Sequence, residues 1–134
     1  MRLQLALGLL LLAATPASAA AENWQPVPGE TDTYYDADFL RVDQQSGLVL
    51  VRSAIGRKAG AGYQEWSDKE PITVSALDCK GDTYRDLGLD FEGDAALPDG
   101  WRTRRAQSGI TFGVGGAGTL ACKLRGTLPS VALP

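Results

Sequence analysis

This chain has few residues of the types that carry out catalysis. A residue type that the commonest catalytic sites require is missing. The 134 residues include no histidine. Nucleophilic sites of the Ser-His-Asp or Cys-His type are therefore excluded, as are His-ligated metals and the commonest general base. The Gly-rich residues 113–118 lack the Lys-Ser/Thr ending of a phosphate-binding loop. We expect no enzymatic activity, no metal and no cofactor.

Acidic residues are grouped in two places. Asp36 lies close to Asp38, and Asp90, Glu92 and Asp94 alternate along a second segment. Paired carboxylates can serve glycoside hydrolysis or bind calcium. Neither group has the spacing of an EF-hand loop, and Asp is common in turns. Solvated strand ends and turns are the favoured interpretation, and a carboxylate-dependent hydrolase is the weaker alternative.

A basic segment near the C-terminus is the better candidate for binding. Arginine next to aromatic residues is favoured at binding surfaces. As a strand, the segment would place its first and fifth residues on one face and its second and fourth on the other. Residues 100–134 contain five bases and no acid, whereas residues 22–43 contain six acids and one base. We expect the acidic and basic segments to lie near each other in one fold. The candidate partner-binding residues are Trp101, Arg102, Arg104 and Arg105.

The first 21 residues predict a secretory signal peptide. Arg2 is followed by an uncharged Leu- and Ala-rich stretch, and residues 15–19 end in small side chains. This pattern predicts cleavage after Ala19 or Ala21. The apolar run is too short for a membrane-spanning helix, which needs about 20 residues. We expect a single exported domain over residues 22–134, with no transmembrane segment after signal removal. With a net charge of −3, the chain is also a poor candidate for nucleic-acid binding.

Cys79 and Cys122 are the only cysteines. In an oxidising compartment such a pair most often forms an intramolecular bridge. Two Cys without His cannot complete a four-ligand zinc site, and no C-x-x-C redox motif exists. The sequence therefore predicts a Cys79–Cys122 disulfide. A closed loop of about 44 residues corresponds to about 4 kcal/mol of stabilisation.

Short β-like segments separated by turn residues dominate the chain after the signal. Four consecutive apolar residues at 48–51 predict a strand covered on both faces. Residues 55–62 predict a hairpin connection. One helix is predicted at 116–124, weakened by its glycines and stopped by Gly126. The fold class is α+β, with a single antiparallel β-sheet and a C-terminal helix packed on one face and tied by the disulfide. The other predicted strands are 33–35, 39–42, 72–79, 84–91 and 101–105.

Several short motifs follow one another along the chain. They are Asn23-Trp24, Thr33-Tyr34-Tyr35-Asp36, Arg41, Gly47-Leu48-Val49-Leu50-Val51, Ser75-Ala76-Leu77-Asp78-Cys79, Tyr84-Arg85, Trp101 and Cys122. Their order resembles the surface-adhesin protein E-like family of small exported bacterial proteins, over a span from Trp24 to Cys122. The resemblance implies an antiparallel sheet with a C-terminal helix tied by a disulfide, and an adhesive role toward host proteins. The Gly-rich stretch before Cys122 and the dozen residues after it depart from the family pattern.

The residue types and the family resemblance together favour a binding function over a catalytic one. The leading hypothesis is an exported cell-envelope binding module, adhesive in type, in the periplasm or on the outer surface of a bacterial cell. Its partner would be a protein or an anionic glycan. The alternative is a periplasmic structural or accessory protein of non-enzymatic role. A homodimer through an exposed sheet edge belongs to that second hypothesis.

Overall fold

The computed structural model describes residues 22–59, 62–64, 72–89 and 97–134. The predicted signal peptide at 1–21 and the acidic group at Asp90, Glu92 and Asp94 lie outside these described residues. No helix within the described ranges is both long enough and apolar enough to cross a membrane.

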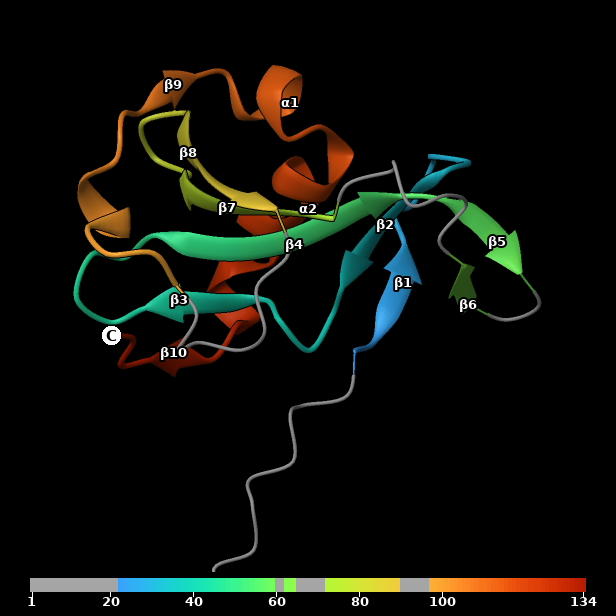
Figure 1. The fold of residues 1–134 in the computed structure, drawn as a ribbon, viewed down its shortest axis with the longest axis horizontal. Helices are drawn as coiled ribbons and strands as arrows, with labels where there is room; N and C mark the ends of the chain where they lie inside the picture. The colour runs from blue at the N-terminus through green and yellow to red at the C-terminus, as the bar shows by residue number, and fades with distance from the viewer. Residues whose placement is uncertain (1–21, 60–61, 65–71, 90–96) are drawn as a thin grey trace, which may run out of the picture.

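The centre of the fold is an eight-stranded sheet whose main path runs β1-β2-β4-β7-β8-β9 (Figure 1). β2 pairs with the end of β4, and β3 pairs with the start of β4. β10 pairs with β3 in parallel. All other pairings are antiparallel, so the predicted fold class is confirmed with one parallel exception. The strands are β1 (Trp24–Pro26), β2 (Thr33–Asp36), β3 (Arg41–Asp43), β4 (Val49–Ile55), β7 (Thr73–Asp78), β8 (Thr83–Leu89), β9 (Gln107–Ser108) and β10 (Ser130–Val131).

A separate antiparallel pair is formed by β5 (Arg57–Ala59) and β6 (Gly62–Gln64). Residues 55–62, predicted as the loop of a hairpin connection, therefore contribute largely to strands, because β4 continues to Ile55 and β5 and the start of β6 lie within the range.

The core lies on both faces of β4. Val49, Leu50 and Val51 are completely buried, as their unbroken apolar run predicts. Val49 and Val51 pack toward the helices, whereas Leu50 packs with Val74 on the opposite face. Two apolar layers therefore enclose the sheet, one under the helices and one under the segment that contains Trp101.

The helices are α1 (Ile110–Gly113) and α2 (Gly116–Leu124), and α2 packs against β4 and β2 (Figure 1). The predicted helix range is confirmed to the residue. Glycine weakens a helix, but here it permits close packing: a Cβ on Gly118 would lie 2.8 Å from side-chain atoms of Ile110 and Val114. The predicted Cys79–Cys122 disulfide is also confirmed, and it ties α2 to the end of β7.

The strand predicted over residues 101–105 is wrong. Trp101–Thr103 forms a turn of 3₁₀-helix, η2, entered through Gly100 in a left-handed conformation with φ 67°. The position beside β8 is taken instead by β9. Because the Trp101 ring covers the second apolar layer and is 3 % exposed, the chain turns inward here rather than extending along the sheet.

Candidate functional site

A buried ion pair joins the acidic N-terminal part of the chain to the basic C-terminal part. Asp43, at the end of β3, is completely buried. The Arg102 guanidinium donates to it twice, from Nε to Oδ2 at 2.7 Å and from Nη2 to Oδ1 at 2.9 Å. Ser46 donates its backbone N–H to the same carboxylate at 3.0 Å. The Arg102 hydrogen bonds, with those of Ser46, lower the pKa of Asp43 to about 2. The expected proximity of the two segments is confirmed at this pair.

Arg102 is fixed by further contacts. Its Nη2 also donates to the carbonyl of Leu133 at 2.7 Å, and its guanidinium lies 4.5 Å from the centre of the Trp101 ring. The Trp101 indole N–H donates to the carbonyl of Pro134 at 2.8 Å. Trp101 therefore packs in the core, and Arg102 forms an ion pair within the protein.

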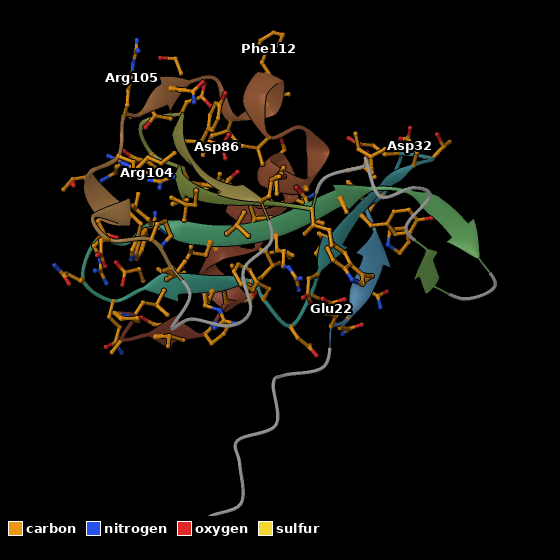
Figure 2. The ribbon with its side chains drawn as sticks, in the orientation of Figure 1. Glu22, Asp32, Asp86, Arg104, Arg105 and Phe112 are labelled. Atoms are coloured by element: carbon orange, nitrogen blue, oxygen red, sulfur yellow. A yellow bond between two sulfur atoms is a disulfide. The ribbon has the colours of Figure 1, made fainter. Side chains whose placement is uncertain are left out.

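The four predicted partner-binding residues therefore do not form one surface. Arg104 and Arg105 are exposed. Arg104 donates from Nη1 to the carbonyl of Asp86 at 3.2 Å, and Figure 2 shows Arg105 extending away from the ribbon. Trp101 lies inside, so it offers almost no surface to a partner. The structure separates the segment into one buried aromatic residue, one arginine committed to an ion pair with buried Asp43, and two exposed arginines.

A different set of basic residues comes together in a cavity of about 360 Å³ at one end of the sheet. A volume of this size is near the lower end of the range for small-molecule sites, about 300–1,000 Å³. Four cationic side chains line it, and they come from the β7–β8 turn, β8, η2 and the segment after α2. The lining residues are 46–48, Asp78, Lys80, Arg85, Arg102 and Arg125. We call this cavity the basic pocket.

Arg85 is the most unusual member of the basic pocket. It pairs across the sheet with Ala76, which pairs in turn with Leu50, and both of those side chains are completely buried. Its Nε and Nη1 atoms are shielded from solvent and have no hydrogen-bond partner among the described residues. A shielded cation that has no ion-pair partner among the described residues is costly, and an anion in the pocket would offset that cost.

The disulfide positions two further cations of the basic pocket. Lys80 directly follows Cys79 in the β7–β8 turn, and Arg125 begins the short 3₁₀-helix η3 (Arg125–Thr127), three residues after Cys122. The Cα atoms of the two cysteines are 5.5 Å apart. Bridging therefore holds the segment bearing Lys80 close to the segment bearing Arg125.

The β3–β4 turn closes the same side of the pocket. Gly47 adopts φ 74°, and a Cβ placed on it would lie 3.6 Å from Nη2 of Arg125. Lys80 and Arg125 form no ion pair with any residue that the structure describes. These two cations are therefore available to a ligand.

Charge in the basic pocket does not cancel. Of the four described cations, Arg102 is neutralised by Asp43, and Asp78 is the one carboxylate among the described lining residues. Two of these four positive charges are thus offset, which leaves the described lining with a net charge of about +2. Positive potential of this kind attracts anions.

The sequence contained one usable signal for Arg85, which our sequence reasoning missed. Arg85 is two residues from Leu87, so on a strand both point to the same side. Leu87 is 2 % exposed and belongs to the second apolar layer. An arginine that points to the same side of a strand as a buried leucine is expected to be shielded from solvent. Lys80 and Arg125 carried no comparable local signal because the fold alone brings them together.

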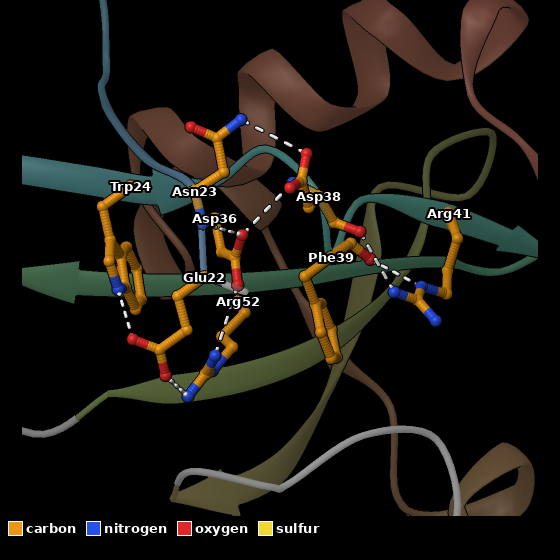
Figure 3. A network of polar contacts seen from close by, with 8 residues as sticks. All are labelled: Glu22, Asn23, Trp24, Asp36, Asp38, Phe39, Arg41 and Arg52. Atoms are coloured by element: carbon orange, nitrogen blue, oxygen red, sulfur yellow. Dashed lines mark hydrogen bonds and ion pairs between the residues drawn. The ribbon is translucent and has the colours of Figure 1, made fainter. Parts of the chain in front are cut away.

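The Asp36–Asp38 pair belongs to a polar network near the start of β1 (Figure 3), and neither residue is among the described residues that line the basic pocket. Asp36 is buried, and its Oδ2 accepts from Nη1 of Arg52 at 3.2 Å. Its other oxygen accepts the backbone N–H groups of Asn23 and Asp38. Asp38 Oδ1 accepts from the Asn23 side chain at 3.2 Å. These carboxylates are engaged in holding β1 to β2 and β4.

Glu22 completes this network. It accepts from Nη2 of Arg52 at 2.8 Å and from the indole N–H of Trp24 at 2.9 Å. The Trp24 hydrogen bond, followed by Arg52, lowers the pKa of Glu22. Within the described ranges, no group of three or more His, Cys, Asp or Glu side chains is placed to hold a metal ion.

Comparison with protein-family models, with curated proteins and with solved structures gives no match for this chain.

Proposed function

We propose that this protein is an exported cell-envelope binding module that holds an anionic partner in the basic pocket. The observation that carries the proposal is the Arg85 guanidinium, which lines the cavity with two nitrogens shielded from water and unpartnered within the described part of the chain. An ion of opposite charge is the ligand that such a group binds most strongly.

Export is supported by the disulfide and by the sequence of the first 21 residues. Structural disulfides persist in oxidising compartments and are rare in the cytosol. The bridge lies between the two cation-bearing segments, so it contributes to the site as well as to stability. The surface-adhesin resemblance fits this proposal, with a protein carrying acidic groups or an anionic glycan as the adhesive partner.

The proposal is tested by comparing two arginine variants that change the net charge equally. Arg85→Ala removes the shielded guanidinium, and Arg105→Ala removes an exposed one outside the basic pocket. The oxidised protein and each variant are passed over an immobilised sulfated polysaccharide and over polyglutamate, and the salt concentration that releases them is measured. We expect Arg85→Ala to elute at lower salt than the parent protein and Arg105→Ala to elute unchanged.

Equal loss in both variants would show nonspecific charge attraction and would contradict the proposal. Circular dichroism establishes that each variant is folded. If Arg85→Ala does not fold, Arg125→Ala takes its place, because Arg125 is exposed and also lines the cavity. Fractionation of the producing cells tests export separately, and a protein confined to the cytosol would contradict that part.

The structural alternative relies on pairing of exposed sheet edges, and the edges of the main path are poorly suited to it. β1 and β9 end that path, with three and two residues. β1 ends in Pro26, which has no backbone N–H to offer a partner. Short edge strands and edge prolines discourage pairing between copies. We therefore expect a monomer by size-exclusion chromatography with light scattering.

A further inference from the structure

We infer that the anionic partner presents a phosphate monoester to the basic pocket. The inference rests on the proposed function and specifies the chemical class of the ligand. Its basis is the combination of charge, donor geometry and volume in the cavity lined by Lys80, Arg85 and Arg125.

Charge favours a dianion. After Asp43 and Asp78 offset two of the four cations, the described lining of the cavity keeps a net charge of about +2. A phosphate monoester carries a charge of about −1.5 to −2 at pH 7, because its second pKa is about 6. A carboxylate or a sulfate ester carries only −1. The phosphate monoester is the common biological group that neutralises the pocket most nearly.

Donor geometry favours the same group. Guanidinium groups bind phosphate oxygens in bidentate fashion, and a lysine adds a compact point charge. Arg85 on β8 and Arg125 at the start of η3 supply guanidinium groups, and Lys80 in the β7–β8 turn supplies the ammonium. Arg102 has less to give, since its Nε and Nη2 are committed to Asp43. Three cationic side chains from three segments can therefore each contact one of the three terminal oxygens of a phosphate monoester.

The volume of the cavity and the Asp78 carboxylate in its lining suit an ester rather than free phosphate. A cavity of about 360 Å³ leaves space beside a phosphoryl group for the alcohol that carries it. Asp78 lines this space, and its Oδ1 accepts the backbone N–H of Gly81 at 3.0 Å. Its Oδ2 has no hydrogen-bond donor within the described ranges, so it can accept from a hydroxyl of the ligand. A phosphorylated sugar has both groups.

The test compares three ligands that share a sugar ring. Isothermal titration calorimetry of the oxidised full protein measures the affinity for glucose 6-phosphate, glucose 6-sulfate and glucuronate. We expect glucose 6-phosphate to bind at least about tenfold more tightly than the other two at about pH 7.5. We expect this advantage to shrink at about pH 5.5, below the second phosphate pKa. Arg85→Ala and Arg125→Ala should each weaken binding about tenfold or more, and Arg105→Ala should not.

Two outcomes separate this inference from the proposed function. If the sulfate ester or glucuronate binds as tightly as the phosphate, and Arg85→Ala weakens it, the phosphate inference is overturned and the anion-binding function stands. If no anionic probe, including the immobilised polysaccharide and polyglutamate, depends on Arg85, both are overturned.

A second arm identifies the source of the phosphate. Phosphatidylcholine vesicles containing phosphatidic acid present a monoester on a membrane, and vesicles containing phosphatidylglycerol present a diester. Sedimentation with the phosphatidic acid vesicles alone supports a lipid headgroup, whereas binding of glucose 6-phosphate without sedimentation supports a free or glycan-borne phosphate. Equal sedimentation with both vesicle types, unchanged in Arg85→Ala, would overturn the inference.

Discussion

Replacing Asp43 with Asn should remove a defined, pH-dependent part of the stability. Asp43 is completely buried, and Arg102 and Ser46 lower its pKa from the ordinary 3.8 to about 2. The two values differ by nearly two pH units, and each unit corresponds to about 1.4 kcal/mol. At pH 7 the ionised carboxylate therefore contributes about 2 kcal/mol to the free energy of unfolding.

The sign of this pH dependence follows from the lowered pKa. The unfolded chain binds a proton at Asp43 before the folded chain does, so acid favours the unfolded state. The contribution is complete above about pH 5, falls to about half near pH 3 and is nearly lost at pH 2. It should appear as a steeper acid limb in the parent protein than in Asp43→Asn.

Urea unfolding at about pH 7 and pH 3 measures this contribution in the parent, in Asp43→Asn and in Asp99→Asn. Asp99 is an exposed turn residue, so its variant is the control for the same change of charge. We expect Asp43→Asn to be about 2 kcal/mol less stable than the parent at pH 7 and closer to it at pH 3. If the parent and Asp43→Asn lose the same free energy of unfolding between the two pH values, the pH dependence does not come from the Asp43–Arg102 pair and the reasoning is refuted.

Three further predictions concern the disulfide, the helix packing and the second apolar layer. Replacing both Cys79 and Cys122 with Ser should cost about 4 kcal/mol in urea unfolding and weaken retention on the anionic column, because both cysteines hold cation-bearing segments. Gly118→Ala should lower the melting temperature despite alanine's helix preference, since its Cβ would lie 2.8 Å from two side chains; Gly126→Ala, with nothing within 4 Å, should not. Trp101→Ala should cost about 3–5 kcal/mol by urea unfolding, and Trp101→Phe clearly less.

Local patterns predicted the long central strands and the longer α-helix, but not β1, β9, β10 or α1. The unbroken apolar run at 48–51 indicated a strand covered on both faces, and Val49, Leu50 and Val51 are indeed fully buried. The helix at 116–124 was predicted from leucine spacing and a following glycine, both of which act within one or two turns. Where the residues that determine an element lie close together in the sequence, their pattern was sufficient to predict that element.

Predictions failed where distant contacts decide the structure. Residues 101–105 alternate like a strand, but burial of Trp101 and the reach of Arg102 to Asp43 turn the chain into η2. The parallel pairing of β10 with β3 joins residues far apart in the chain and leaves no local pattern. The basic pocket was missed for the same reason. Its cations come from four separate segments, and only the topology and the disulfide bring them to one cavity.

The bridge between Cys79 and Cys122 also has a consequence for the order in which the basic pocket is assembled. The two cysteines are 43 residues apart in the chain, so the bridge can form only after both cation-bearing segments have been synthesised. Thiols stay reduced in the cytosol. On the proposed function, a reduced precursor there would hold the two cation-bearing segments less firmly and would bind phosphorylated metabolites more weakly. Formation of the bridge after export would then strengthen binding of the ligand.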